Sequence, residues 1–535
     1  MLSSRNASFC ADQHNSQRCP AKSKRALTAA CVLSFGAATY AVVNPPDLTL
    51  VALLHTAAGE HLEQSELLAL VQQSQGAAAF DLAFEHGNEL FDTTFNALDG
   101  VGADVGDGQR FTRLPRADQG GPGEWAAHVP ARTTGPNAAS CAKCHDDPAD
   151  DGAGGTESNV IRDPFHWGNP RRMLQRNTPH LFGAGALQRL AEEMTVDLLA
   201  IRAALLAQVQ QAGGSATAPL ISKGVEFGVL RAYRPWWSGQ VHFDFTQVEG
   251  IDNDLVVRPY QWKGSVAFLR DFNRDAAHNE LGMQAVELVG YAHDGDHDHV
   301  VDELTVGDMT ALAVYIAAQP RPVTRRELAT LGLIPALSPA EIASIQSGEA
   351  AFANIGCAEC HRPTLVLTDP IFREPSAHAK FRDATFPGSQ NPVAEGVTPA
   401  FPVQFDLTQD QPDNVIVVGS QTVHLGSFVR IGTGPTATVA LYGDLKRHRM
   451  GYGLAENIDE TGRGASTFLT ENLWGVGTTA PYLHDGRATT LTEAILAHAG
   501  EAGASRQAFV ALPTSQQQDV IAFLDDLVLY KVEHK

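Results

Sequence analysis

The sequence predicts a mainly α-helical protein made of two similar modules in tandem, with a small β-excursion and long loops in the first module. Three observations support this fold class. The pattern Cys-x-x-Cys-His occurs twice, at residues 141–145 and 357–361. Segments with the periodicity of amphipathic helices flank both copies. A stretch of about forty Gly- and Pro-rich residues precedes the first copy alone, and it predicts a long loop there.

The N-terminal segment has the pattern of an export signal. Lys22, Lys24 and Arg25 precede an apolar run over residues 26–43, and the small residues around Ala41 suit cleavage. The run also has about the length of a short membrane span, so an uncleaved anchor is the alternative. We therefore assign residues 1–43 to a signal peptide or N-terminal anchor and expect a periplasmic protein. Contact with a membrane is expected only through such an uncleaved anchor.

The charge balance limits the kinds of partner. Among 535 residues, 61 are acidic and 39 are basic, which gives a formal net charge of −22. A surface of this sign repels nucleic acid and attracts basic proteins. A nucleic-acid partner is thus excluded, whereas a small basic electron carrier fits.

The cysteines fall into two groups. Cys10, Cys19 and Cys31 lie in or before the export segment, and the other four of the seven belong to the two Cys-x-x-Cys-His motifs. In an oxidising compartment, spare thiols usually pair as disulfides. The exported chain has no spare thiol, so its cysteines must serve another chemistry.

That chemistry is the covalent attachment of haem. Two thiols one helical turn apart can each form a thioether with a vinyl group of the porphyrin, and the adjacent histidine binds the iron. The motifs predict two haem c groups, bound through Cys141 and Cys144 and through Cys357 and Cys360, with His145 and His361 as axial ligands. A shared zinc site is disfavoured because over 200 residues separate the motifs. A dithiol redox pair would not need a histidine after both motifs.

The second module, residues 331–535, has the plan of a cytochrome c-type haem domain. Ser338, Pro339 and Glu341 are typical of a helix start, and the following helix leads to Cys357. Residues 515–530 carry apolar side chains on one helical face. We expect these two helices to cross beside the haem.

The first module, residues 44–330, is a haem domain with insertions. Helices are predicted over residues 79–97, 181–211 and 304–318, and alternating polarity predicts the β-excursion over residues 225–262. Pro320 and Pro322 end the last helix. The boundary between the modules is placed between Pro320 and Pro339.

Several further segments resemble bacterial di-haem oxidoreductases, which are related to the di-haem cytochrome c peroxidases. They are residues 135–137, 176–180, 258–263, 444–451 and 479–487. The resemblance extends from about residue 80 to the C-terminus, and residues 480–487 are its most specific part. It implies one six-coordinate haem that passes electrons and one that opens to bind hydrogen peroxide. It also implies a small donor protein, either a cytochrome or a cupredoxin.

The sequence offers several candidates for the second axial ligand of each haem. Met450 is the only methionine after the second motif, and His448 and His484 are its rivals. For the first haem, the resemblance makes His166 and His180 candidates for a removable ligand. An exposed or structural role is the alternative for each histidine, and core packing is the alternative for Met450.

The catalytic acid–base group is also open. The Phe-Trp-Asp-Gly-Arg segment of the peroxidases is replaced here by residues 182–187. Glu192 and Glu193 follow it and are candidates, although both suit the solvated face of a helix. Trp167 and Trp262 are candidate electron relays, and large core residues otherwise. A non-enzymatic electron carrier and an oxidase of organic substrates are the alternative functions.

An acidic loop predicts a calcium site. Asp294, Asp296, Asp298 and Asp302 place oxygen ligands at alternating positions. His299 stands where an EF-hand has glycine and Thr305 where it has its bidentate glutamate, so the loop is nearer to shorter calcium loops. Related peroxidases bind calcium between their haem domains. The alternatives are a transition-metal site or a solvated acidic loop.

Overall fold

The computed structural model describes residues 59–96, 98–101, 138–155, 159–162, 173–295, 300–409, 411–412, 415–418 and 421–531. All of these belong to one compact unit, Leu54–Lys535. The export segment predicted over residues 1–43 lies outside the described residues. Over the described ranges, none of the helices has both the length and the apolar composition that a bilayer span requires.

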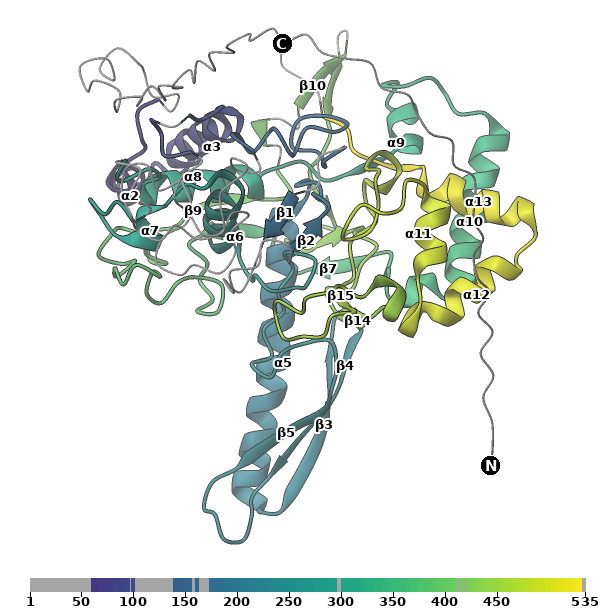
Figure 1. The fold of residues 1–535 in the computed structure, drawn as a ribbon, viewed down its shortest axis with the longest axis horizontal. Coiled ribbons are helices and arrows are strands. Elements are labelled where there is room, and N and C mark those ends of the chain that lie inside the picture. The colour runs from purple at the N-terminus through teal and green to yellow at the C-terminus, as the bar shows by residue number, and fades with distance from the viewer. Residues whose placement is uncertain are drawn as a thin grey trace, which may run out of the picture. The chain divides into compact units, whose positions relative to one another are not determined.

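Three packed helices form the core of the first module. They are α2 (Gln64–Gln72), α3 (Gly76–Asp92) and α8 (Val306–Ala317), which lie together in Figure 1. A Cβ atom at Gly87 would lie 2.4 Å from the carbonyl oxygen of Ala311. Glycine at this position therefore lets α3 approach α8 closely. The structure confirms the helices predicted over residues 79–97 and 304–318, with shifted ends.

Shorter elements complete this module. They are β1 (Asn159–Arg162) paired with β2 (Met173–Arg176), α6 (Leu269–Ala276), a π-helix (Ala277–Leu281) and α7 (Val286–Val289). The π-helix directly continues α6. Single-turn π-helices are rare in proteins, and those that occur are often found at functional sites.

The long helix α5 (Ala184–Ala212) and a three-stranded antiparallel sheet form an arm. The strands are β3 (Ser215–Ser222), β4 (Val225–Tyr233) and β5 (His242–Val248), in the order β3–β4–β5. Figure 1 shows the arm extending away from the neighbouring elements. The sequence predicted α5 and the two later strands. It missed β3, because this strand alternates small residues and contains a proline, which give no strand signal.

Two crossing helices frame the second module, as predicted. Helix α10 (Pro339–Asn354) begins at a capping box formed by Ser338 and Glu341. It packs on α13 (Thr514–Leu524), and a Cβ at Gly348 would lie 1.8 Å from the backbone oxygen of Asp519. Helix α13 ends earlier than the predicted residue 530. The chain there becomes β16 (Leu527–Val528), which pairs with β6 (Val323–Thr324).

The second module contains more β-structure than the sequence predicted. Its further strands are β7 (Leu365–Leu367), β8 (Ile371–Glu374), β9 (Val403–Asp406), β10 (Val415–Val418), β11 (Gln421–His424), β12 (Val429–Arg430), β13 (Ala437–Val439), β14 (Arg447–Arg449) and β15 (Thr467–Leu469). Its further helices are α11 (Leu491–Ala497) and α12 (Gly503–Ala511), and α9 (Arg325–Thr330) precedes it at the predicted boundary. Strands this short are set by tertiary pairing, and they show no periodicity in sequence. Helices thus frame both modules, but the fold also includes several small sheets. The tandem haem-domain arrangement and the boundary between Pro320 and Pro339 stay predictions.

Candidate haem sites

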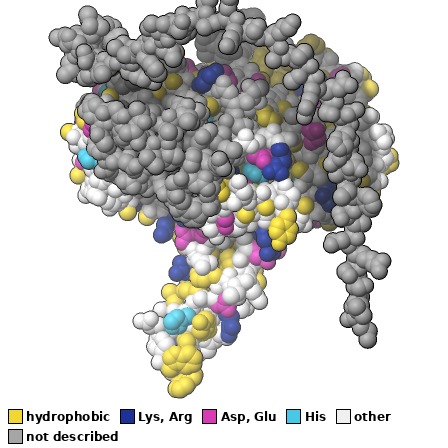
Figure 2. Space-filling view, viewed as in Figure 1, with side chains coloured by type: hydrophobic (Ala, Val, Ile, Leu, Met, Phe, Trp, Pro, Cys, Tyr) yellow, Lys and Arg dark blue, Asp and Glu magenta, His cyan; other side chains and the backbone are white. Residues whose placement is uncertain are grey.

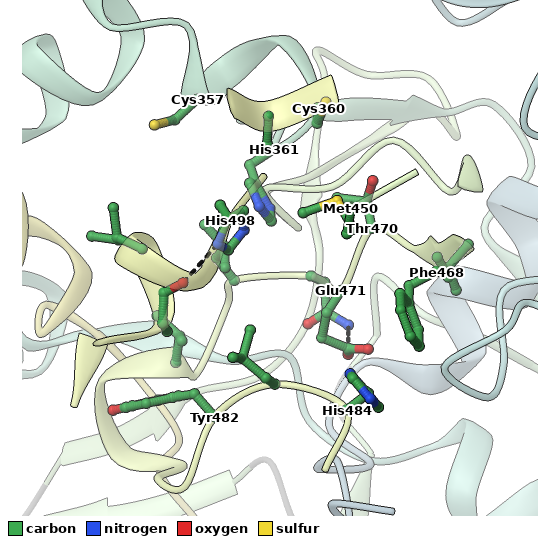
Figure 3. A pocket seen from close by; sticks show the side chains of 18 of the residues that line it. Cys357, Cys360, His361, Met450, Phe468, Thr470, Glu471, Tyr482, His484 and His498 are labelled. Carbon is green, nitrogen blue, oxygen red and sulfur yellow. Dashed lines mark hydrogen bonds between the residues drawn. The ribbon is translucent and has the colours of Figure 1, made fainter. Parts of the chain in front are cut away.

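The second Cys-x-x-Cys-His motif lines a cavity of about 240 Å³. Cys357, Cys360 and His361 lie on its wall, and both thiols are free of disulfides (Figure 3). Apolar side chains form much of the remaining wall: Phe352, Leu454, Leu473, Leu491, Ile495 and Leu524. A largely apolar cavity with two thiols and an imidazole at its edge fits a covalently attached porphyrin.

The backbone around His361 prepares its imidazole for a metal. The His361 amide donates to the Cys357 carbonyl at 3.0 Å, which closes one turn and brings the motif's side chains together. Its Nδ1 lies 3.2 Å from the Tyr442 carbonyl oxygen. Burial lowers the pKa of His361 to about 4, so the ring is neutral. A neutral histidine held through Nδ1 presents Nε2 to a metal, as metal ligands in proteins do.

A second histidine, His498, faces the same cavity. It follows α11, and its Nδ1 lies 2.7 Å from the carbonyl oxygen of Ala494. The centres of the His361 and His498 rings are 6.4 Å apart, and the two rings are neighbours in Figure 3. Two imidazoles on opposite sides of one metal ion, with bonds of about 2 Å, have ring centres roughly 6 Å apart. The pair can therefore hold one iron. Sequence reasoning did not consider His498, because nothing local separates it from the other histidines.

Met450, the ligand expected first, lies in the same cavity. It lines the wall beside Thr470, and its backbone amide donates to Ser466 at 2.8 Å (Figure 3). Its position is compatible with contact to the porphyrin. The ring separation of 6.4 Å places His498 relative to His361, and this supports His498 rather than Met450 as the second ligand.

His448 is engaged elsewhere. Its Nε2 lies 2.8 Å from Asp444 and its Nδ1 lies 2.8 Å from Glu501. Burial opposes protonation, but the hydrogen bond to Asp444 raises the pKa of His448 to about 10. A protonated ring with both nitrogens bound to carboxylates has no lone pair for iron. This placement argues against His448 as the axial ligand.

His484 lies at another part of the wall. Its ring stacks on Phe468, with centroids 4.3 Å apart, and Figure 3 shows both well away from His361. Its Nε2 is 3.9 Å from Glu456 and 3.8 Å from Asp485. The alternative that His484 binds opposite His361 is therefore not supported by the geometry.

A carboxylate that the sequence did not indicate also lines this cavity. Glu471 accepts a hydrogen bond from the Asn472 side chain at 3.1 Å. Burial raises its pKa to about 7. A carboxyl group that changes charge near neutral pH, beside a haem, can couple proton uptake to reduction.

The first motif repeats this local design in a smaller cavity. Cys141, Cys144 and His145 line a cavity of about 80 Å³. The Nδ1 of His145 lies 3.2 Å from the Gly152 carbonyl oxygen, and burial lowers the pKa of His145 to about 4. The apolar wall consists of Leu90, Phe91, Phe95, Leu181, Phe272, Leu281, Leu304, Leu312 and Ile316.

The polar side chains of the first cavity differ from those of the second. Asn273, on α6, has a buried Nδ2 that finds no acceptor within the described part of the chain. Glu280, on the π-helix, lines the same cavity. Apart from His145, the described residues that line this cavity include no histidine or methionine.

A short segment separates the two cavities. Thr178 lines both of them, and His180 lines the second one. His180 was expected beside the first haem, but its Nε2 lies 2.9 Å from the backbone oxygen of Trp474. Trp474 is buried, and its indole N–H meets no acceptor among the residues described. A buried N–H group without an acceptor in this wall could donate a hydrogen bond to a haem propionate.

Trp262, a predicted relay, also lies in the wall of the second cavity. Its indole N–H donates to the Asn177 carbonyl at 2.8 Å, which places it next to the segment between the cavities. His166 and Trp167 lie outside the described residues.

The acid–base candidates on α5 lie in neither cavity. Glu192 is buried against Arg189 and Gln188. Glu193 binds Lys223 and accepts from the backbone amide of Asp369 at 2.7 Å. Both carboxylates are used in structural ion pairs, so the proposal that either one acts in catalysis is not supported by their placement.

The predicted calcium loop is described only at its ends. Asp296 and Asp298 lie outside the described residues. The Asp302 carboxylate accepts from the Ala292 amide at 2.7 Å, and Asp294 is described at the other end of the loop. Calcium binding stays a prediction.

Taken together, the two cavities each combine two thiols with a buried histidine, an arrangement that fits a haem. The model of a family described as "Di-haem oxidoreductase, putative peroxidase" matches residues 417–527, which include His498 and much of the second cavity. The resemblance drawn from the sequence is therefore confirmed, and this part of the chain is that of a haem-dependent oxidoreductase.

Other comparisons add little. No curated protein matches the chain. A solved structure described as a MauG-like protein associated with microbial copper homeostasis is 13% identical, and the alignment covers 65% of this chain and 89% of that one. Its TM-score is 0.25, which is too low to support a structural argument.

Proposed function

We propose that this protein is an exported di-haem c-type oxidoreductase that reduces hydrogen peroxide with electrons from a small donor protein. The observation that carries the proposal is the unequal supply of iron ligands in the two cavities. The second cavity offers His498, whose ring centre is 6.4 Å from that of His361, whereas the described residues that line the first cavity, which exclude His166, offer no histidine or methionine besides His145. A closed iron suits electron transfer, and an open one suits substrate binding.

Each motif holds its own haem. Cys141 and Cys144 supply the thioethers of the first, and Cys357 and Cys360 those of the second. His145 and His361 are oriented by the carbonyl groups of Gly152 and Tyr442. The haem iron supplies one-electron chemistry and, where a position is open, a site for peroxide.

In the second cavity, His498 completes the coordination. Its Nδ1 is fixed by the Ala494 carbonyl, so its Nε2 faces the cavity in a defined orientation. Ligation by two histidines keeps this site closed to peroxide and limits structural change when an electron arrives. This cavity then serves to receive electrons from the donor.

In the first cavity, Asn273 and Glu280 act on the substrate. The unpaired Nδ2 of Asn273 can donate a hydrogen bond to a peroxide oxygen. Glu280 lines the same cavity, and its carboxylate would be the acid–base group that moves a proton from one peroxide oxygen to the other. Cleavage of the O–O bond needs this proton shift, because hydroxide is a poor leaving group.

Electrons must cross the wall between the cavities. Thr178 touches both cavities, and His180 and Trp474 are hydrogen-bonded beside it. The formal charge of −22 favours a donor with a basic docking surface, such as a small cytochrome or a cupredoxin. Export through residues 1–43 and a calcium ion at residues 294–302 belong to the same proposal.

Two measurements test the proposal: the spin state of the two irons and the turnover of peroxide. Electron paramagnetic resonance of the fully oxidised holoprotein should show one low-spin and one high-spin ferric iron, the high-spin signal should persist when one electron per molecule is added, and peroxide should be consumed with a reduced cytochrome as donor. Two permanently low-spin irons would instead indicate a simple electron carrier. Turnover of an organic substrate without peroxide reduction by the cytochrome would indicate an oxidase.

A further inference from the structure

The free end of the arm carries two exposed indole rings. Trp236 is 92% exposed and Trp237 is 72% exposed, in the loop between β4 and β5. The rings are perpendicular, with centroids 5.6 Å apart. Figure 2 shows hydrophobic side chains gathered at this end of the arm.

These tryptophans have no role in the core of the arm. That core is formed by buried residues of α5, β3 and β4, among them Leu205, Val209, Leu220, Leu230 and Ala232. Large aromatic surfaces exposed together usually mark an interaction site. The pair therefore serves a contact outside the arm.

The arm as a whole, Ala184–Val248, is balanced in charge, with five basic and five acidic residues, but its outer part has a small basic excess. Between Asp197 and Glu249 the basic residues are Arg202, Lys223, Arg231 and Arg234, and the acidic ones are Glu226 and Asp244. Two of the arginines cover aromatic rings near the tip. Arg202 lies 4.9 Å from the centre of Phe243 and Arg231 lies 5.5 Å from that of Tyr233.

The chemistry of the tip fits one kind of partner. Indole rings favour the headgroup layer of a bilayer, and neighbouring arginines are attracted to anionic lipids. A stable protein interface typically takes roughly 800 Å² from each partner, so a pair of indoles at a narrow tip is the smaller feature that a bilayer surface can accept. We propose that the tip of the arm docks on an anionic lipid bilayer, with Trp236 and Trp237 in the headgroup layer.

Docking would also fix the second haem site relative to the membrane. Arg362, which follows His361, donates to the carbonyl of Gly224 at 2.6 Å in the turn between β3 and β4. Lys446 donates to the Glu226 carbonyl at 2.8 Å. The base of the arm is thus bound to the segment that carries the second motif, so the bilayer would hold this cavity at a set distance.

Vesicle binding tests the proposal. The purified holoprotein is sedimented with vesicles of phosphatidylglycerol and phosphatidylethanolamine, and with phosphatidylcholine vesicles. Quenching of tryptophan fluorescence by brominated acyl chains is measured in parallel. The wild type should prefer the anionic vesicles. Trp236→Ser with Trp237→Ser should weaken binding at least about tenfold, since two buried indoles are lost. Arg234→Gln should weaken it about fivefold.

The controls separate the arm from other membrane contacts. Tyr452→Ser removes an aromatic residue that is 98% exposed but lies off the arm, and it should bind as the wild type does. Haem content and circular dichroism should be unchanged in every variant. An N-terminal anchor would raise sedimentation equally in all variants but would not alter the difference in quenching. Equal binding together with equal quenching in the double tryptophan variant overturns the proposal. So does a wild type that binds no vesicles, which would leave a protein partner.

Discussion

The two cavities share an attachment motif and differ in what surrounds it. In both, the histidine of the motif binds a backbone carbonyl through Nδ1 at 3.2 Å. The second cavity adds His498, Met450 and Glu471, whereas the first adds Asn273 and Glu280. The motif therefore gives both cavities the same local design, and the neighbouring helices give each cavity different polar side chains.

The largest expected effect comes from removing one attachment site at a time. Cys141→Ala with Cys144→Ala, and separately Cys357→Ala with Cys360→Ala, should each leave a protein with one haem. Both should lose peroxide reduction by the donor, because each haem has a separate task. Intact mass and the haem absorbance measure the loss. Full activity in either variant would show that the two cavities do not have separate functions.

The next effect concerns proton transfer in the first cavity. Glu280→Gln should lower kcat/KM for peroxide by about 10² to 10⁴-fold, the range for loss of an acid–base group. Asn273→Leu should lower it by about 10²-fold. Stopped-flow measurement of the peroxide reaction checks both. Glu192→Gln is the matched control, and an equal loss there would point to a general effect of buried carboxylates.

A smaller effect on turnover but a clear spectroscopic one is expected at the second haem. His498→Ala should convert this iron to high spin, because its second axial ligand is lost. Met450→Leu should leave it low-spin. Electron paramagnetic resonance of the oxidised proteins distinguishes the two. If Met450→Leu gave the change instead, the ligand first expected from the sequence would be correct.

The smallest expected effect is a pH dependence at the second haem. The pKa of Glu471 is raised to about 7 by burial. Above this pH the carboxylate is charged and opposes the added electron, so the midpoint potential should fall as pH rises. The slope should approach about 59 mV per pH unit at most. Glu471→Gln should make the potential independent of pH near neutrality, as measured by spectroelectrochemical titration, and the exposed Glu341→Gln should not.

The sequence predicted the elements with strong local signals. The helix start at Ser338, the long helix α5 and the crossing of α10 with α13 all follow from capping residues and apolar periodicity. The strands from β7 to β15 were missed because each has two to four residues. Such segments form only when a partner strand from elsewhere in the chain supplies the hydrogen bonds.

The residues of the candidate sites divide in the same way, into those with a local sequence signal and those that only the fold brings together. The haem attachment residues were assigned from spacing alone, because thioether chemistry requires neighbouring thiols. His498, Asn273 and Glu280 were not identified, since each comes from a different helix far from its motif. Glu192 and Glu193 were close to the first motif in sequence, yet the fold directs both into ion pairs outside the cavities.

By itself, the sequence predicted two haem sites, the cysteines of each and the histidine expected to bind each iron. These features depend on residues within a single helical turn. Only the tertiary structure decided that His498 lies beside His361, which carboxylates reach a cavity and which tryptophans stay exposed at the end of the arm. Those properties depend on side chains that come together across hundreds of residues, and their spacing in the sequence carries no record of the distances that folding creates.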